Sequence, residues 1–339
     1  MNRRPHEYIE RATGAVVREH LLGNAMLTAL YSPALEKAPL LTQVASSRYL
    51  SRVLGYLNYD NLLSARATGM LKFLRDSGVP ISEFVGDLSE YDTVRKIFER
   101  QIRYWSVRPM PADPRSVVCP ADARVLVGSM TESSGLCLKH KFFSFPELLG
   151  EGLPWRIKFA AGDYAVFRLT PEKYHYTHSP VTARVLAIYA LDGRYHPCNP
   201  NAAVQLLTPV SKNRRVVTIL DTEIPGGSGV GYVAMIEVVA LMVGRIEQRY
   251  SDERYQHPRP VVPGMVLRRG APKALFRPGS STVVLLFEPG RIRFADDLRE
   301  NQRRHGIVNR FSLTLGRPLA ETDVAVRSLL AVPVQEEAC

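Results

Sequence analysis

The feature that most constrains the fold is a change in apolar patterning at the proline-rich segment 108–114. After it, short runs of β-branched and aromatic residues alternate with glycine, proline and aspartate, which is typical of strands joined by turns. These runs are Val117–Val118, Arg124–Val127, Tyr164–Leu169, Ala183–Tyr189, Arg215–Leu220, Tyr232–Val239 and Val283–Phe287. The sequence therefore predicts a β-rich domain over residues 108–339.

Before this segment, apolar residues follow a helical period, most clearly at residues 50–57 and 94–102. Glycines and prolines divide the stretch from Tyr8 to about Tyr104 into several short helices. We predict an α+β fold in which these N-terminal helices, in residues 1–107, pack on a mainly antiparallel β core. Residues 15–31 carry a broad apolar surface that could contact a membrane, although packing on the protein body is the favoured interpretation.

The composition restricts the class of protein. The net charge is +11, but the basic residues are scattered and no aromatic reading motif accompanies them. Attraction to anionic lipid therefore explains the charge better than nucleic-acid binding, which we do not predict. No run of about 18 uncharged apolar residues predicts a membrane span, and the first residues lack the apolar segment of a secretory signal. The four cysteines lack the spacing of a disulfide framework, which favours a reducing compartment.

A turn of small residues, Gly279-Ser280-Ser281-Thr282, runs directly into the apolar strand Val283–Phe287. Such a turn suits backbone self-cleavage, in which a serine hydroxyl attacks the preceding carbonyl and elimination leaves a pyruvoyl group. Serine is a weak nucleophile and needs a base. Without one, the segment would be an ordinary loop.

Two histidines, His175 and His178, could supply that base. They could equally be structural, or two ligands of a metal. No further ligand stands at a recognisable spacing, so we predict no metal site. Asp122 lies at the entry to a predicted strand and is one of several acidic residues that could orient a histidine.

In their order along the chain, these segments resemble the phosphatidylserine decarboxylase family of pyruvoyl-dependent, self-cleaving proenzymes. The segment Cys119–Ala123 is similar to the family motif Ser-Pro-Ala-Asp-Gly, and Lys173–Val181 is similar to Asp-Tyr-His-Arg-x-His-x-Pro-Val. Gly279–Thr282 is similar to the Gly-Ser-Thr cleavage motif of the family. The resemblance covers roughly residues 90–320. The matching segments are Cys119–Ala123, Lys173–Val181, Asn213–Glu223, Val239–Ile246 and Gly279–Thr282.

The resemblance implies a catalytic triad of Asp122, His178 and Ser281. His178, oriented by Asp122, would be the general base for attack of the Ser281 hydroxyl on the carbonyl of Ser280. Cleavage would separate residues 1–280 from residues 281–339. Ser281 would become the pyruvoyl group, the covalent cofactor that acts as electron sink when carbon dioxide leaves.

The resemblance also implies that His175 takes part in decarboxylation and that Thr282 positions the cleavage turn. The family has glycine where this chain has Ser280, which opens cleavage between Gly279 and Ser280 as a second register. We favour Ser281, because the strand that begins with Thr282 aligns without a gap.

The activity implied is conversion of phosphatidylserine to phosphatidylethanolamine in phospholipid biosynthesis. The enzyme would be cytoplasmic and peripherally associated with an anionic membrane surface. Its partners would include its own two fragments, and a homodimer is left open. Lys173 and Tyr176 replace an acid and an arginine beside the histidines, which motivates one alternative, the same chemistry on a soluble amino acid or aminoacyl metabolite. The other alternative is a non-cleaving homologue that binds lipid or a partner.

Overall fold

A computed structural model describes residues 6–19, 64–131, 145–150, 154–193, 209–239, 245–278 and 281–334. The helical pattern predicted at residues 50–57 lies outside the described residues. So do Gly279, Ser280 and most of the apolar segment 15–31.

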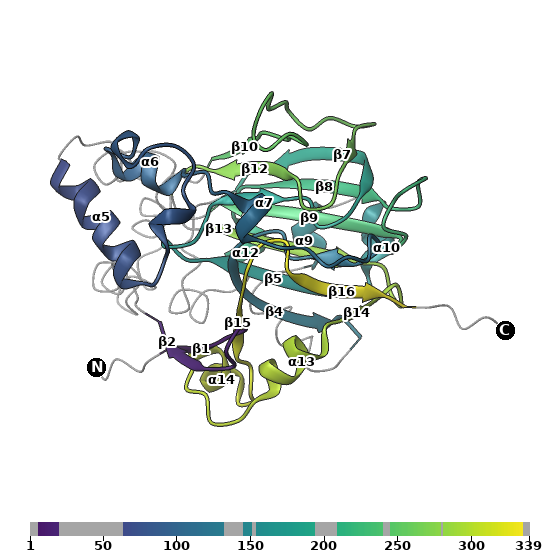
Figure 1. Ribbon diagram of the computed structural model, residues 1–339. Coiled ribbons are helices and arrows are strands. Elements are labelled where there is room, and N and C mark those ends of the chain that lie inside the picture. Colours follow the sequence, from purple (N-terminus) through teal and green to yellow (C-terminus); the bar gives the residue numbers. More distant parts are fainter. Residues whose placement is uncertain are drawn as a thin grey trace.

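Within the described chain, ten strands form one large sheet, which crosses the molecule in Figure 1. Their order is β11-β7-β8-β9-β13-β5-β4-β15-β1-β2, and all neighbours are antiparallel except β1 and β15. The mainly antiparallel core predicted from the sequence is therefore confirmed. The strands are β1 (Glu7–Glu10), β2 (Val16–Arg18), β4 (Ala123–Ser129), β5 (Asp163–Leu169), β7 (Ala183–Leu191), β8 (Arg215–Asp221), β9 (Tyr232–Val239), β11 (Val266–Leu267), β13 (Ser281–Phe287) and β15 (Glu321–Val324).

Two smaller antiparallel sheets complete the described β structure. The first has the order β10-β12-β6, with β10 (Ile246–Gln248), β12 (Pro272–Phe276) and β6 (Tyr176–His178). The second has the order β14-β16-β3, with β14 (Ile292–Phe294), β16 (Leu329–Pro333) and β3 (Val117–Val118).

The described helices are short, apart from α5 (Ser64–Asp76) and α13 (Asp296–Arg303). Helices α5 and α6 lie together at one end of the large sheet, on the left of Figure 1. None of the helices in the described ranges is long and apolar enough to cross a membrane. The remaining elements are η2 (Ile81–Glu83), η3 (Leu88–Glu90), α6 (Val94–Phe98), α7 (Tyr104–Val107), α9 (Phe145–Leu149), α10 (Trp155–Phe159), α12 (Pro209–Lys212) and α14 (Arg310–Leu315).

The start of the chain corrects the prediction of helix from Tyr8 onward. Residues 7–10 and 16–18 form the β1–β2 hairpin, which adds to the large sheet beside β15 (Figure 1, purple). β1 pairs with residues more than 300 positions away along the chain, so no local period could reveal it. Ile9 is fully buried, which explains why the strand holds this position.

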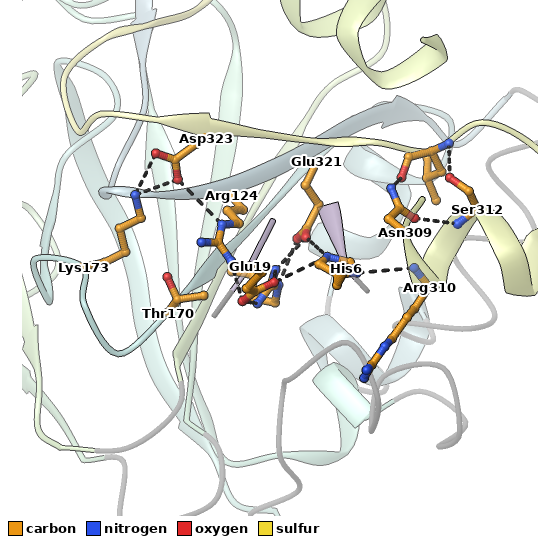
Figure 2. Close-up of polar contacts among 12 residues, drawn as sticks. His6, Glu19, Arg124, Thr170, Lys173, Asn309, Arg310, Ser312, Glu321 and Asp323 are labelled. Carbon is orange, nitrogen blue, oxygen red and sulfur yellow. Dashed lines mark hydrogen bonds and ion pairs between the residues drawn. The ribbon is translucent and has the colours of Figure 1, made fainter. Parts of the chain in front are cut away.

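A buried ion cluster fastens this hairpin (Figure 2). Arg168 on β5 bonds both Glu19, which follows β2, and Glu321 on β15, with N–O distances of 2.6–2.9 Å. His6 Nε2 lies 2.7 Å from Glu321 Oε2. Burial alone would raise the pKa of Glu19, but the charges of Arg168 and Arg124 together outweigh it and lower the pKa to about 2. The ligand atoms of His6, Glu19 and Glu321 lie within 4.8 Å of one another, as a metal would need. Because the arginines already neutralise both carboxylates, the cluster is a structural ion-pair network that holds the hairpin on the sheet, and we assign no metal to it.

Strand β13 lies near the centre of the large sheet, and all seven of its residues are buried. Val283, Leu285 and Phe287 contribute to one apolar cluster, whereas Val284 and Leu286 contribute to another. This alternation gives the sheet two covered faces. Phe276 of β12 joins the first cluster, so the β10-β12-β6 sheet packs on the face to which Val283 points.

Candidate active site

Ser281 is the first residue of β13 and lies opposite Leu169 of β5 and Val239 of β9. By strand alternation its side chain shares the face of Val283, which the β10-β12-β6 sheet covers. The residue is fully buried, and its hydroxyl has no hydrogen-bond partner among the described residues. A buried hydroxyl without a partner is costly and is often explained by a functional role. The flanking Thr282 is buried and points to the opposite face.

Backbone hydrogen bonds bring the motif segments together. His178 N donates to Pro120 O at 2.8 Å, which joins the histidine segment to the segment of Asp122. Phe276 N donates to His175 O at 3.0 Å, which joins the histidines to the chain that leads into β13. Three segments that are far apart in the sequence therefore meet at one corner of the fold.

The His178 ring is held from both sides. Nδ1 lies 2.8 Å from Gly270 O, and Nε2 lies 3.0 Å from the Tyr174 hydroxyl. Because a carbonyl oxygen only accepts, Nδ1 carries the proton and Nε2 accepts from Tyr174. The Tyr174 hydroxyl in turn lies 2.6 Å from that of Tyr255. Burial lowers the pKa of His178 to about 3, so the ring is neutral, which is the form a general base requires.

His175 is fully buried and stacks on Phe98, with ring centroids 3.6 Å apart. Within the described part of the chain neither ring nitrogen has a hydrogen bond of good geometry, but the backbone of Thr170 and of Pro171 lies close enough for a weak one that raises the pKa of the ring. Burial, aided by the charge of Arg100, lowers the pKa of His175 well below its usual value. His175 is thus a buried, neutral base, and its backbone bond to Phe276 places it beside the chain that leads into the Ser281 strand.

Asp122 is also buried at this corner, but its carboxylate binds other groups. Arg108 donates to both oxygens at 2.9 and 3.1 Å, and Val326 N donates at 2.7 Å. Burial raises the pKa of Asp122, and the Arg108 guanidinium lowers it more, so the net shift is downward. Among the described contacts there is no hydrogen bond between Asp122 and His178, or between His178 and Ser281. Asp122 influences His178 through its charge, which raises the pKa of the ring.

Lys173 and Tyr176, the two residues beside the histidines that differ from the family motif, both make structural contacts. Lys173 Nζ lies 2.6 Å from the Asp323 carboxylate, which balances its charge. The Tyr176 hydroxyl accepts from Gln101 at 3.3 Å. Neither side chain brings a free charge to the histidine corner.

Sequence reasoning missed several residues that hold this corner. No sequence motif marks Arg108, Tyr255 or the buried pair Glu237–Lys273. Only Glu237 gave a signal, because it interrupts an otherwise apolar run from Gly231 to Val243. A charge in a buried strand needs a partner, and here the partner is Lys273 at 2.7 Å.

Comparisons with known proteins identify the family of this chain. A family model described as phosphatidylserine decarboxylase matches residues 94–315. The chain belongs to the phosphatidylserine decarboxylase family. It is 31% identical to the phosphatidylserine decarboxylase proenzyme of Chlamydia felis over 319 residues, which cover 93% of this chain and 99% of that relative. The proenzyme of Bordetella petrii is 33% identical over 271 residues, covering 76% of this chain and 91% of that relative.

The matched range of the family model covers the motif segments. The matched range contains Asp122, both histidines and Ser281. It begins at the first residue of α6 and ends at the last residue of α14, so it also covers the strands on either side of Ser281.

Proposed function

We propose that this protein is a phosphatidylserine decarboxylase made as a proenzyme, a carboxy-lyase that converts phosphatidylserine to phosphatidylethanolamine. The observation that supports the proposal is the fully buried Ser281 hydroxyl at the start of β13, which has no hydrogen-bond partner among the described residues and lies on the face covered by the histidine-bearing sheet. A second buried group, the neutral ring of His175, belongs to the segment that is bonded through Phe276 to the chain leading into β13.

Self-cleavage would begin when the Ser281 hydroxyl attacks the carbonyl carbon of Ser280. His178 would take the hydroxyl proton through Nε2, which would require it to exchange Tyr174 for Ser281. As the ester forms, the nitrogen of residue 281 leaves the Ser280 carbonyl carbon as an amine and takes the proton from His178. Elimination then frees the carboxylate of residue 280 and leaves dehydroalanine at position 281. Addition of water with loss of ammonia would convert it to the pyruvoyl group. Asp122 would favour the protonated state of His178 by its charge, while Arg108 keeps Asp122 ionised.

The residues present fit a pyruvoyl group at position 281. Its ketone supplies the electron sink for loss of carbon dioxide. His175, buried and neutral, would exchange a proton with the substrate. Arg100 and Arg327 lie close enough to lower the pKa of the histidines, and their positive charge favours an anionic phosphoserine head group.

The fold suits an enzyme that keeps both of its fragments. After cleavage, β13 would remain paired on both sides, with β5 and β9 of the first fragment. Strand β15 would remain between β4 and β1. We further propose that the enzyme is cytoplasmic and binds the membrane peripherally, since the net charge of +11 favours an anionic surface.

The test is release of labelled carbon dioxide from phosphatidylserine in anionic vesicles, compared with release from free serine. We expect activity on the phospholipid only, none in a Ser281→Ala variant, and cleavage without decarboxylation in a His175→Gln variant. Turnover of free serine by a cleaved enzyme that ignores vesicles would favour the soluble-substrate alternative. A folded wild-type chain without activity or cleavage would favour the non-cleaving homologue.

A further inference from the structure

A closed network of four polar side chains lies buried between the large sheet and the histidine-bearing sheet. Glu237 Oε2 accepts from Lys273 at 2.7 Å and from Gln248 at 2.9 Å, and Lys273 also donates to Gln248 Oε1 at 2.8 Å. Glu237 Oε1 accepts from the Thr177 hydroxyl at 2.6 Å. Thr177, Glu237 and Lys273 are fully buried. Every carboxylate oxygen therefore has a partner, and the two charges cancel.

The network lies beside Ser281. Glu237 is two residues from Val239, the residue opposite Ser281, and its side chain shares the same face of the sheet. Such diagonal neighbours are separated by roughly 7–8 Å. At its other end the network binds Thr177, the residue directly before His178. It thus links the strand next to the nucleophile to the strand of the histidines.

An irregularity in β12 turns Lys273 toward this network. Pro272 pairs with His178 and Ala274 pairs with Thr177, so Lys273 is an extra residue in the β12 register. Leu275, two positions further on, packs with Tyr176 on the opposite side of the small sheet, where a regular strand would also have placed Lys273. Bulges of this kind often redirect a side chain next to an active site.

Stability alone explains this arrangement poorly. Removing a lysine and a glutamate from water is costly, and apolar residues of similar volume often stabilise a core as well or better. Burial lowers the pKa of Lys273, which shows that the desolvation cost acts on this ammonium group. Directional hydrogen bonds provide what apolar packing does not, a fixed register between two sheets.

We propose that Thr177, Glu237, Lys273 and Gln248 form a positioning network that holds the histidine strand in register with Ser281 for self-cleavage. The inference rests on the proposed function, because it assigns the network to that reaction. These residues act through the histidine strand and the neighbouring strands, and none of them is assigned contact with the reacting atoms.

The test compares three single substitutions in a pulse-labelled cell-free synthesis, following conversion of the 38.0 kDa chain into its fragments. Thr177→Val removes the hydrogen bond of the Thr177 hydroxyl to Glu237, together with its longer contact of 3.4 Å to Ala274 O, and Thr177→Ser keeps the hydroxyl. Thr218→Val is the matched control, because Thr218 is equally buried in β8 and its hydroxyl has no partner among the described residues. We expect cleavage at least tenfold slower in Thr177→Val and near the wild-type rate in the other two.

A fourth variant, Glu237→Leu with Lys273→Met, replaces the ion pair with apolar side chains. We expect it to fold, with a melting temperature near that of the parent in a Ser281→Ala background, yet to cleave at least tenfold more slowly. Wild-type rates in folded Thr177→Val would overturn the inference. Equal slowing by Thr177→Ser would also overturn it, because the hydroxyl would then not be the cause. If the double variant does not fold, the Thr177 pair decides alone. A wild-type chain that never cleaves would instead refute the proposed function.

Discussion

Replacing Arg108 with methionine removes the bidentate partner of Asp122 and leaves its buried carboxylate without that partner. It also removes the ion pair of Arg108 with Glu83, at 2.9 Å, which adds to the loss. The side chains of Arg108 and Asp122 are 16% and 9% exposed, so the pair is largely shielded from water. Loss of one partner of such a pair costs about 3–5 kcal/mol. Because Val326 N still donates to Asp122, we expect the lower end of that range, about 3 kcal/mol at neutral pH.

The loss of stability in Arg108→Met should depend on pH, and the direction follows from the pKa of Asp122. In the wild type, the lowered pKa of Asp122 adds stability above the unfolded value of about 3.9, and this is lost as the pH falls through the folded pKa. Without Arg108, burial dominates and raises the folded pKa above the unfolded one. The deficit of Arg108→Met should therefore be largest at neutral pH and should shrink as the pH falls toward about 4.

The assay is urea unfolding of Arg108→Met in a Ser281→Ala background, where the chain stays in one piece. Arg108→Lys is the matched control, since it keeps the charge but loses the bidentate geometry, and about 1–2 kcal/mol should be lost. A deficit in Arg108→Met below about 1 kcal/mol, or one that does not change with pH, would refute the claim that Arg108 keeps Asp122 ionised.

Three further predictions concern the same single-chain background or the mature enzyme. Because the pKa of His178 falls to about 3 on folding, stability should decline below pH 6.5, and His178→Gln should flatten that decline in urea midpoints. Arg168→Met should cost about 3–5 kcal/mol and expose the amides of residues 7–18 to hydrogen exchange before the core. After cleavage the two fragments should co-elute in gel filtration and separate only in denaturant, because β13 is paired on both sides.

The predicted strands after the proline-rich segment agree closely with the structure, since β-branched runs report local burial. Tyr232–Val239 is β9, and Val283–Phe287 forms the greater part of β13. The same reasoning failed at residues 7–10, whose strand depends on a parallel pairing with β15. Such long-range pairing leaves no period in the local sequence.

The candidate site was predicted in its residues more than in its contacts. The motif order selected Asp122, both histidines and Ser281, and backbone hydrogen bonds join the segments of Asp122 and the histidines to each other and to Phe276, five residues before Ser281. Sequence could not show that Arg108 binds Asp122, because an ion pair between surface-type residues has no spacing signature. For the Glu237 network, the one signal in the sequence is the charge of Glu237 within an otherwise apolar run.

The most direct test of the account is the intact mass of the purified wild-type protein beside Ser281→Ala. We predict two wild-type fragments, residues 1–280 and residues 281–339, the second with a pyruvoyl group at its N-terminus, whereas Ser281→Ala stays whole at 38.0 kDa. A second fragment that begins at residue 280 would move the cofactor to Ser280. A folded wild-type chain that remains at 38.0 kDa would contradict the account.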